Sequence, residues 1–211
     1  MMNLTNFEKL PLMGIMRGIE KADIEPLVET VIGAGLETLE VTMNTQGAPD
    51  LIREARKASG GKLTIGAGTV LSEEDLEKAL DAGASFIVMP CNIKEVIETC
   101  IKRNIPVFPG AFTPTEVWNA HKAGAAMVKV FPSSMFGPKY IKELKGPFND
   151  VKLMAVGGVK LEGIGEYFSN GASAVAFGAS VFKKEWLKTG DFKSIGSLVR
   201  QYVEAVKEAV G

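Results

Sequence analysis

The stretch VIGAGLETLEVT at residues 31–42 contains the pattern that organises this chain: the end of a helix, a glycine, and an apolar run that closes on a polar residue. Three other segments repeat it, with the sequences ALDAGASFIVMP at 79–90, AHKAGAAMVKVFP at 120–132 and YFSNGASAVAFGAS at 167–180. In each segment the glycine is placed to end a helix in the left-handed conformation, and the apolar run has the composition of a strand. The four segments therefore predict a repeated joint between a helix and a strand.

The other predicted strands lie in four further apolar segments, PLMGIMRG at 11–18, KLTIGAGTV at 62–70, IPVFPGA at 105–111 and VKLMAVGG at 151–158. Their nearly continuous apolar character indicates strands that are covered on both faces, as in a parallel sheet. The predicted strands begin near residues 11, 36, 62, 85, 105, 127, 151 and 174, with helical stretches between them.

Eight regular strand–helix units without a linker favour one domain over residues 1–211, an α/β fold of the (β/α)8 or TIM-barrel type. We expect two helices outside the eightfold pattern, LTNFEKL near the N-terminus and DFKSIGSLVRQYVEAVKEAV near the C-terminus. The alternative is a doubly wound open sheet. Its dinucleotide fingerprint is absent, because GAGTV at 66–70 lacks the third glycine.

The composition excludes several classes of protein. An apolar content of 46% with 23% charged residues indicates a chain that buries a sizeable core, which excludes intrinsic disorder. The net charge is −1, so we expect no nucleic-acid or membrane partner. The polar start MMNLTNFEKL does not resemble a secretory signal, and Cys91 and Cys100 suit a reducing compartment, which together predict a cytoplasmic protein. His121 is the single histidine, which removes paired-histidine zinc sites, and we expect no metal and no cofactor.

Two ionisable residues stand inside predicted strands, Glu40 in LETLEVTM and Lys129 in AAMVKVFP. An ionisable group in such a place is costly unless it is paired or hydrogen-bonded, so one interpretation is a buried ion pair, or a lysine at the rim with its amine in water. The functional interpretation is that burial and a nearby cation such as Arg17 lower the pKa of the amine, so that it can condense with a ketone. Cleavage of a carbon–carbon bond next to the resulting imine needs a proton acceptor, and Glu40 is the candidate base.

Other strand ends carry candidate binding residues. Arg17 is either the exposed end of the first strand or a bidentate clamp on a substrate carboxylate. Thr69 is either the cap of the following helix, a role for which Ser72 competes, or a site residue. Gly157 and Gly158, and then Gly178, Ala179 and Ser180, follow the seventh and eighth predicted strands, where barrels commonly bind phosphate through backbone amides.

GAGTV at 66–70, Glu40 in LEVT, KVFPSSMFGP at 129–138 and VGGV at 156–159 resemble the bacterial 2-keto-3-deoxy-6-phosphogluconate (KDPG) aldolases. This class I family includes 4-hydroxy-2-oxoglutarate (KHG) aldolase and 2-keto-3-deoxy-6-phosphogalactonate (KDPGal) aldolase. The resemblance implies a homotrimeric, metal-free barrel that cleaves its substrate to pyruvate and an aldehyde, usually glyceraldehyde 3-phosphate. It implies Lys129 as the Schiff-base lysine and Glu40 as the proton shuttle. The binding residues that it implies are Thr69, Pro90 and Phe131 around pyruvate, Arg17 as a carboxylate or other substrate contact, and Gly157, Gly158 and Ser180 at the phosphate.

Two positions depart from many KDPG-type members. This chain has Asn44 where those members carry arginine four residues after the glutamate, and Val156 where they carry threonine before the paired glycines. Both departures are similar to the galactonate-type relatives, so the preferred C4 epimer stays open.

Two other functions remain as alternatives. One is a phosphate-binding barrel isomerase or synthase that uses Glu40 as a base and Lys129 only as an electrostatic clamp. The other is a non-catalytic sugar-phosphate binder. Borohydride reduction in the presence of pyruvate separates the three, because only an imine former becomes modified at Lys129.

Overall fold

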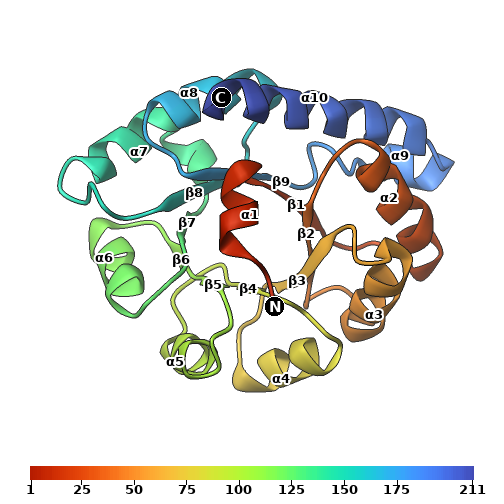
Figure 1. Cartoon of the computed structure of the whole chain (residues 1–211), viewed down its shortest axis with the longest axis horizontal. Coiled ribbons are helices and arrows are strands. Elements are labelled where there is room, and N and C mark those ends of the chain that lie inside the picture. The colour runs from red at the N-terminus through yellow and green to blue at the C-terminus, as the bar shows by residue number, and fades with distance from the viewer.

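The computed structural model describes all 211 residues, and its strands form one parallel sheet curled into a barrel with helices around it (Figure 1). The strands are β1 Leu12–Met16, β2 Thr38–Thr42, β3 Thr64–Gly68, β4 Ile87–Val88, β5 Val107–Phe108, β6 Gly110–Ala111, β7 Val128–Val130, β8 Leu153–Val156 and β9 Ala174–Phe177. Their order in the sheet is β5-β4-β3-β2-β1-β9-β8-β7-β6. The predicted (β/α)8 architecture is confirmed, and the open doubly wound sheet is wrong.

The fifth predicted strand, residues 105–111, is divided into β5 and β6 at Pro109. Proline has no N–H group for the ladder, so regular pairing is interrupted there. β5 pairs with β4 and β6 pairs with β7, and the Pro109 carbonyl accepts a hydrogen bond of 2.9 Å from the Lys129 N–H. The two ends of the strand order are thus joined through one short segment, which closes the barrel.

The helices are α1 Leu4–Lys9, α2 Lys21–Gly33, α3 Ala48–Ser59, α4 Glu73–Asp81, α5 Lys94–Lys102, α6 Pro114–Lys122, α7 Pro138–Lys145, α8 Ile164–Ser169, α9 Lys184–Thr189 and α10 Phe192–Val210. Ser72 caps α4 by accepting a hydrogen bond from the Asp75 N–H, and Thr113 and Glu116 form a reciprocal capping box at α6. The two terminal helices that the sequence predicts are α1 and α10. No helix is both long enough and apolar enough to cross a membrane.

Successive strand residues alternate between two apolar layers. Leu39 and Val41 of β2 face outward, into the large core between the sheet and the helices. A second core fills the barrel itself, with Met13, Val88 and Met154 among its members. Because side chains alternate along a strand, the inward positions continue to the carboxyl end of each strand. The side chains at those ends therefore converge on the mouth of the barrel.

Helix α1 lies across the middle of the barrel in Figure 1 and plugs its other end. Phe7 is buried there, with its ring edge-on to that of Phe108 at a centroid distance of 6.0 Å. The Met2 N–H also donates a hydrogen bond to the Ser85 carbonyl, which fixes the start of the chain against the barrel. With this end filled, the carboxyl ends of the strands are left as the accessible end of the barrel.

Candidate active site

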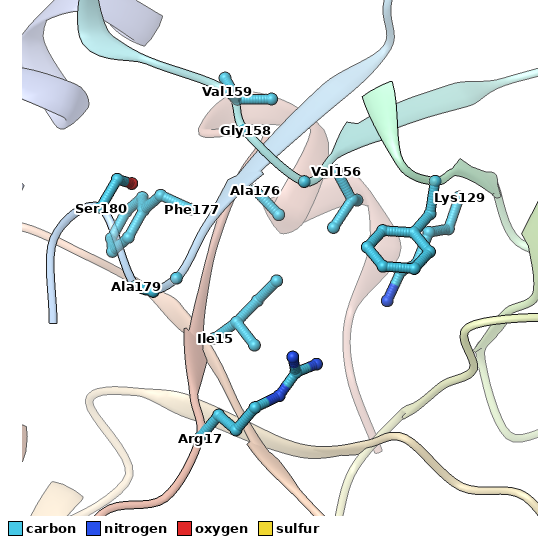
Figure 2. A pocket seen from close by; sticks show the side chains of 13 residues that line it. Ile15, Arg17, Lys129, Val156, Gly158, Val159, Ala176, Phe177, Ala179 and Ser180 are labelled. Carbon is cyan, nitrogen blue, oxygen red and sulfur yellow. The ribbon is translucent and has the colours of Figure 1, made fainter. Parts of the chain in front are cut away.

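A cavity of about 310 Å³ opens at the carboxyl ends of β1, β7, β8 and β9 (Figure 2). It brings together eight of the residues predicted from the sequence: Arg17, Lys129, Phe131, Val156, Gly157, Gly158, Gly178 and Ser180. These residues come from segments that are far apart in the sequence, and the parallel barrel is what gathers them. The cavity lies where barrel enzymes carry their active sites.

Lys129 is the central residue of β7, between Gly110 on one side and Met154 on the other. It is only 4% exposed, and its Nζ atom lies 5.1 Å from the centroid of the Phe131 ring. Burial lowers the pKa of the amine below its ordinary 10.5, and the nearby charge of Arg17 lowers it further, while Glu40 opposes the change. Figure 2 shows the amine pointing into the cavity. A buried amine with a lowered pKa has the properties of a nucleophile.

Glu40 lies in β2 beside Ile15 of β1 and Gly66 of β3, and it is 1% exposed. Its Oε2 atom is buried and has no hydrogen-bond partner. Burial raises the pKa of this carboxyl above its ordinary 4.5, although the positive charges of Lys129 and Arg17 oppose the rise. An unpartnered buried oxygen of this kind is free to accept a proton from a substrate.

The buried ion pair that the sequence allowed as an alternative is not formed. All the ion pairs of the structure join partly exposed side chains elsewhere, and none involves Lys129, Glu40 or Arg17. The second form of that alternative, a lysine with its amine at the watery rim, does not fit a side chain that is 4% exposed. The two groups are therefore close enough to influence each other's pKa but are not neutralised by direct contact.

Arg17 follows β1 and is exposed, and its guanidinium points into the cavity toward the Lys129 amine (Figure 2). The loop that carries it is fixed to the end of β2, because the Gly18 N–H donates a hydrogen bond of 3.0 Å to the Thr45 hydroxyl. The Thr45 hydroxyl lies 3.0 Å from that of Thr42. A buried pair of threonines thus fixes the loop that carries the cation.

Backbone forms much of the opposite side of the cavity. Gly157 and Gly158 both have positive φ values, of 90° and 76°. A Cβ atom on Gly157 would lie 3.0 Å from the Phe131 ring, and one on Gly158 would lie 2.5 Å from the Ser134 Cβ. Side chains are therefore excluded at both positions, for reasons of backbone angle and of space. The peptide groups of this loop, and of Gly178 to Ser180 next to it, border the cavity directly.

Four predicted residues lie outside the wall of this cavity: Glu40, Thr69, Pro90 and Asn44. Thr69 directly follows β3 with a φ of 54°, an uncommon angle for a β-branched residue, and Ser72, not Thr69, caps the next helix. Pro90 follows β4, and its carbonyl lies only 2.2 Å from the position of a Cβ on Gly110. Asn44 is exposed in the loop after β2. Glu40 lies inside β2, and the other three follow the carboxyl ends of their strands.

The wall also contains four residues that were not predicted from the sequence: Ile15, Val159, Ala176 and Phe177. A sequence signal was present for two of them. Ile15 is two residues before Arg17 in one strand, and Ala176 is two residues before Gly178 in another, so each shares the inward face of its strand. No His, Cys, Asp or Glu cluster suited to a metal ion occurs in the structure.

Comparison with known proteins identifies the family. Residues 5–198 match the family model described as KDPG and KHG aldolase. The chain is 36% identical to 2-dehydro-3-deoxy-6-phosphogalactonate aldolase of Escherichia coli K12, over 94% of this chain and 98% of that protein. It is 35% identical to 2-dehydro-3-deoxy-phosphogluconate aldolase of Haemophilus influenzae, over 88% of this chain and 87% of that protein.

Solved structures agree with these sequence matches. The native KDPGal structure has a TM-score of 0.89 and 35% identity, with 96% of this chain and 97% of that chain covered. KDPG aldolase from Legionella pneumophila, with pyruvate captured as a covalent carbinolamine intermediate, has a TM-score of 0.87 and 26% identity, with 95% and 97% covered. Sequence, fold and the residues at the mouth of the barrel thus lead to one conclusion: the chain belongs to the KDPG and KHG aldolase family.

Proposed function

We propose that this protein is a class I aldolase that cleaves a 2-keto-3-deoxy-6-phospho sugar acid to pyruvate and glyceraldehyde 3-phosphate. The observation that carries the proposal is the pair formed by Lys129 and Glu40: a buried amine with a lowered pKa, and a buried carboxyl with a raised pKa and a free oxygen. Membership of an aldolase family supports the same reaction. The activity is that of a carbon–carbon lyase.

In the proposed reaction the neutral amine of Lys129 attacks the C2 ketone, and loss of water gives a protonated imine. Glu40 accepts the proton of the C4 hydroxyl as the C3–C4 bond breaks. The electron pair of that bond moves toward the imine nitrogen and gives an enamine, while C4 leaves as the aldehyde. Protonation at C3 and hydrolysis of the imine then release pyruvate and restore Lys129. Every step is supplied by these two side chains and water.

The remaining residues are proposed as binding groups. Arg17 is suited to hold the substrate carboxylate in a bidentate contact, because its guanidinium points toward the amine (Figure 2). Phe131 borders the cavity beside Lys129, and Thr69 and Pro90 end the neighbouring strands on the Glu40 side, where they would surround the pyruvate moiety. The backbone amides at Gly157, Gly158 and Gly178, with Ser180, are proposed to hold the phosphate.

The preferred C4 epimer of the substrate is proposed from the residues at two positions. Val156 lines the cavity, whereas Asn44 is a short amide in the loop that follows Glu40. Both differ from the KDPG-type pattern, and we infer that the galactonate epimer is cleaved at least as well as the gluconate one. Relatives with each of the two names match this chain, and KHG/KDPG aldolase of Escherichia coli is 29% identical. The unphosphorylated substrate 4-hydroxy-2-oxoglutarate, which would give pyruvate and glyoxylate, is a secondary proposal.

We also propose that the protein acts in the cytoplasm as a homotrimer, in sugar-acid breakdown of the Entner–Doudoroff type. An exposed aromatic group supports self-association: Phe136 is 60% exposed and stacks on Phe112 at 5.3 Å, with Tyr140 against both rings. Met135, next to Phe136, is 66% exposed. A designed protein cage built by fusing symmetric oligomeric domains is a structural neighbour, with a TM-score of 0.87 and 34% identity.

The test of the reaction is borohydride reduction of the protein in the presence of pyruvate, followed by peptide mass analysis. A permanent adduct on Lys129 is the expected result, and Lys129→Ala should lose both the adduct and aldol cleavage while remaining folded. The matched control is Lys152→Ala, which removes a partly exposed lysine that is ion-paired to Glu8. This variant should keep both the adduct on Lys129 and aldol cleavage. An adduct on another lysine, or aldol cleavage by Lys129→Ala, would overturn the role of Lys129. The absence of any adduct would favour an isomerase, a synthase or a simple binder.

A further inference from the structure

Tyr202 is a buried tyrosine of α10 that the proposed reaction does not use. It is 2% exposed, and its hydroxyl donates a hydrogen bond of 3.2 Å to the carbonyl of Val159. Val159 lies in the cavity wall directly after Gly158. One end of this side chain therefore fixes the loop that follows β8.

The same side chain also contacts the end of β9, directly before the loop that follows it. Its ring lies 5.0 Å from that of Phe177, the last residue of β9 and a member of the cavity wall. Burial raises the pKa of the Tyr202 hydroxyl, and the Ser180 side chain opposes this rise. Figure 2 shows Gly158 and Val159 on the loop after β8, Phe177 at the end of β9, and Ala179 and Ser180 on the loop after β9.

The loops after β8 and β9 both border the cavity. Their strands pair through Val156 and Ala176, but no hydrogen bond directly joins residues 157–163 to residues 178–182. A phosphate that is held by backbone amides from both loops needs a fixed separation between them, because such amides cannot reorient independently. Tyr202 contacts both sides of this site, through the Val159 carbonyl and the Phe177 ring.

We propose that Tyr202 is a positioning residue for phosphate recognition: it holds the loops after β8 and β9 at the separation that a phosphate group requires. The proposal rests on the phosphate site described above. It predicts that the Tyr202 hydroxyl contributes to the binding of the phosphate end of the substrate and makes no contribution to the chemistry at Lys129.

The experiment is Tyr202→Phe, which removes the hydroxyl and keeps the ring against Phe177. For a phosphorylated 2-keto-3-deoxy sugar acid we expect KM to rise about 5-fold, the change that one neutral hydrogen bond typically produces, with kcat preserved. The dissociation constant of inorganic phosphate, measured by calorimetry, should rise in parallel. The kcat/KM for unphosphorylated 4-hydroxy-2-oxoglutarate should stay at the parent value.

Tyr167→Phe is the matched control. Tyr167 is also buried, at 4% exposure, and its hydroxyl donates to the Ser133 carbonyl in the loop after β7. Its removal should lower stability by a similar amount without a selective loss of phosphate affinity. If Tyr202→Phe leaves the phosphate dissociation constant unchanged, or weakens both substrates equally, the inference is wrong. Calorimetry of phosphate binding needs no turnover. If the protein formed no adduct with pyruvate, the proposed reaction would be wrong, but the role of Tyr202 in phosphate binding could still be measured.

Discussion

Gly68 leaves the space that the Glu40 carboxylate occupies. A Cβ atom on Gly68 would lie 2.4 Å from Oε1 of Glu40 and 2.5 Å from its Cδ. The two residues are in adjacent strands, with Glu40 paired to Gly66 and Thr42 paired to Gly68. The second glycine of the GAG sequence is therefore required by the side chain of the neighbouring strand, since its own φ is not positive.

We expect Gly68→Ala to displace the Glu40 carboxylate without removing it. General acid–base catalysis typically contributes about 10²–10⁴-fold, so kcat should fall by an appreciable part of that range. The control is Gly33→Ala, because no atom lies within 4 Å of a Cβ at Gly33. Steady-state kinetics of both variants decide the point, and a Gly68→Ala enzyme with the parent kcat would show that the position of the carboxylate does not matter.

Glu40→Gln should lower activity and raise stability at neutral pH. The pKa of Glu40 is raised in the folded protein, so the folded state binds this proton more tightly than the unfolded state does. The stabilisation that the folded state gains from this proton is fully present below pH 4.5, the ordinary pKa of the group. It is lost as the pH rises through the higher pKa that Glu40 has in the folded protein. Gln cannot ionise and avoids this loss. Thermal melts should therefore show a Tm advantage for Glu40→Gln at pH 7 that disappears in acid. Equal Tm values for the parent and Glu40→Gln at pH 7 would show that the buried carboxylate does not lower the stability of the folded protein.

Arg17→Gln should shift the pH dependence of imine formation. The Arg17 cation lowers the pKa of Lys129, so its removal should raise that pKa and move the acid limb of pyruvate trapping to higher pH. Arg17→Lys keeps the charge and loses the bidentate fork, so it should keep the acid limb and raise the KM for the keto acid. The position of this acid limb is measured from initial rates of pyruvate trapping by borohydride over a range of pH. Superimposable profiles for all three proteins would show that Arg17 does not act on the amine.

The exposed aromatic group should matter for assembly. Phe136→Asp places a charge on a side chain that is 60% exposed, and a self-association surface that buries it would be disrupted. Sedimentation should then show a smaller particle than for the parent. Val210→Asp, at a residue that is 44% exposed near the end of α10, is the control and should leave the mass unchanged. A parent protein that sediments as a monomer would reject the trimer outright.

Local patterns predicted much of this fold because the barrel repeats one simple unit. The apolar runs located every strand, and the charges at Glu40 and Lys129 were visible because their neighbours along the chain are apolar. The break at Pro109 was less visible, since it depends on which neighbour each half of the segment pairs with. Tyr202 could not be assigned from its sequence, because an amphipathic helix buries tyrosine for packing alone. Its contacts with Val159 and Phe177, seen only in the structure, distinguish it.

Val156 is the position at which we expect the C4 epimers to be distinguished. It is 2% exposed and lines the cavity, and its N–H donates a hydrogen bond of 3.0 Å to the buried Ser133 hydroxyl. Its backbone is therefore fixed, and a change of side chain should act on the substrate and not on the loop. The gluconate and galactonate substrates differ at C4, whose hydroxyl loses its proton in cleavage. Valine offers that hydroxyl no hydrogen bond.

Val156→Thr adds a hydroxyl to a side chain of nearly the same shape. A hydrogen bond to the C4 hydroxyl of one epimer is worth about 1 kcal/mol, so the ratio of kcat/KM values should move toward the gluconate epimer by about 5-fold. Val159→Thr makes the same change at the phosphate end of the same cavity and should leave the ratio unaltered. Parallel kcat/KM measurements on both epimers provide the test. A parent enzyme with a strong gluconate preference that Val156→Thr does not change would show that specificity is set elsewhere, with the loop that carries Asn44 as the next position to vary.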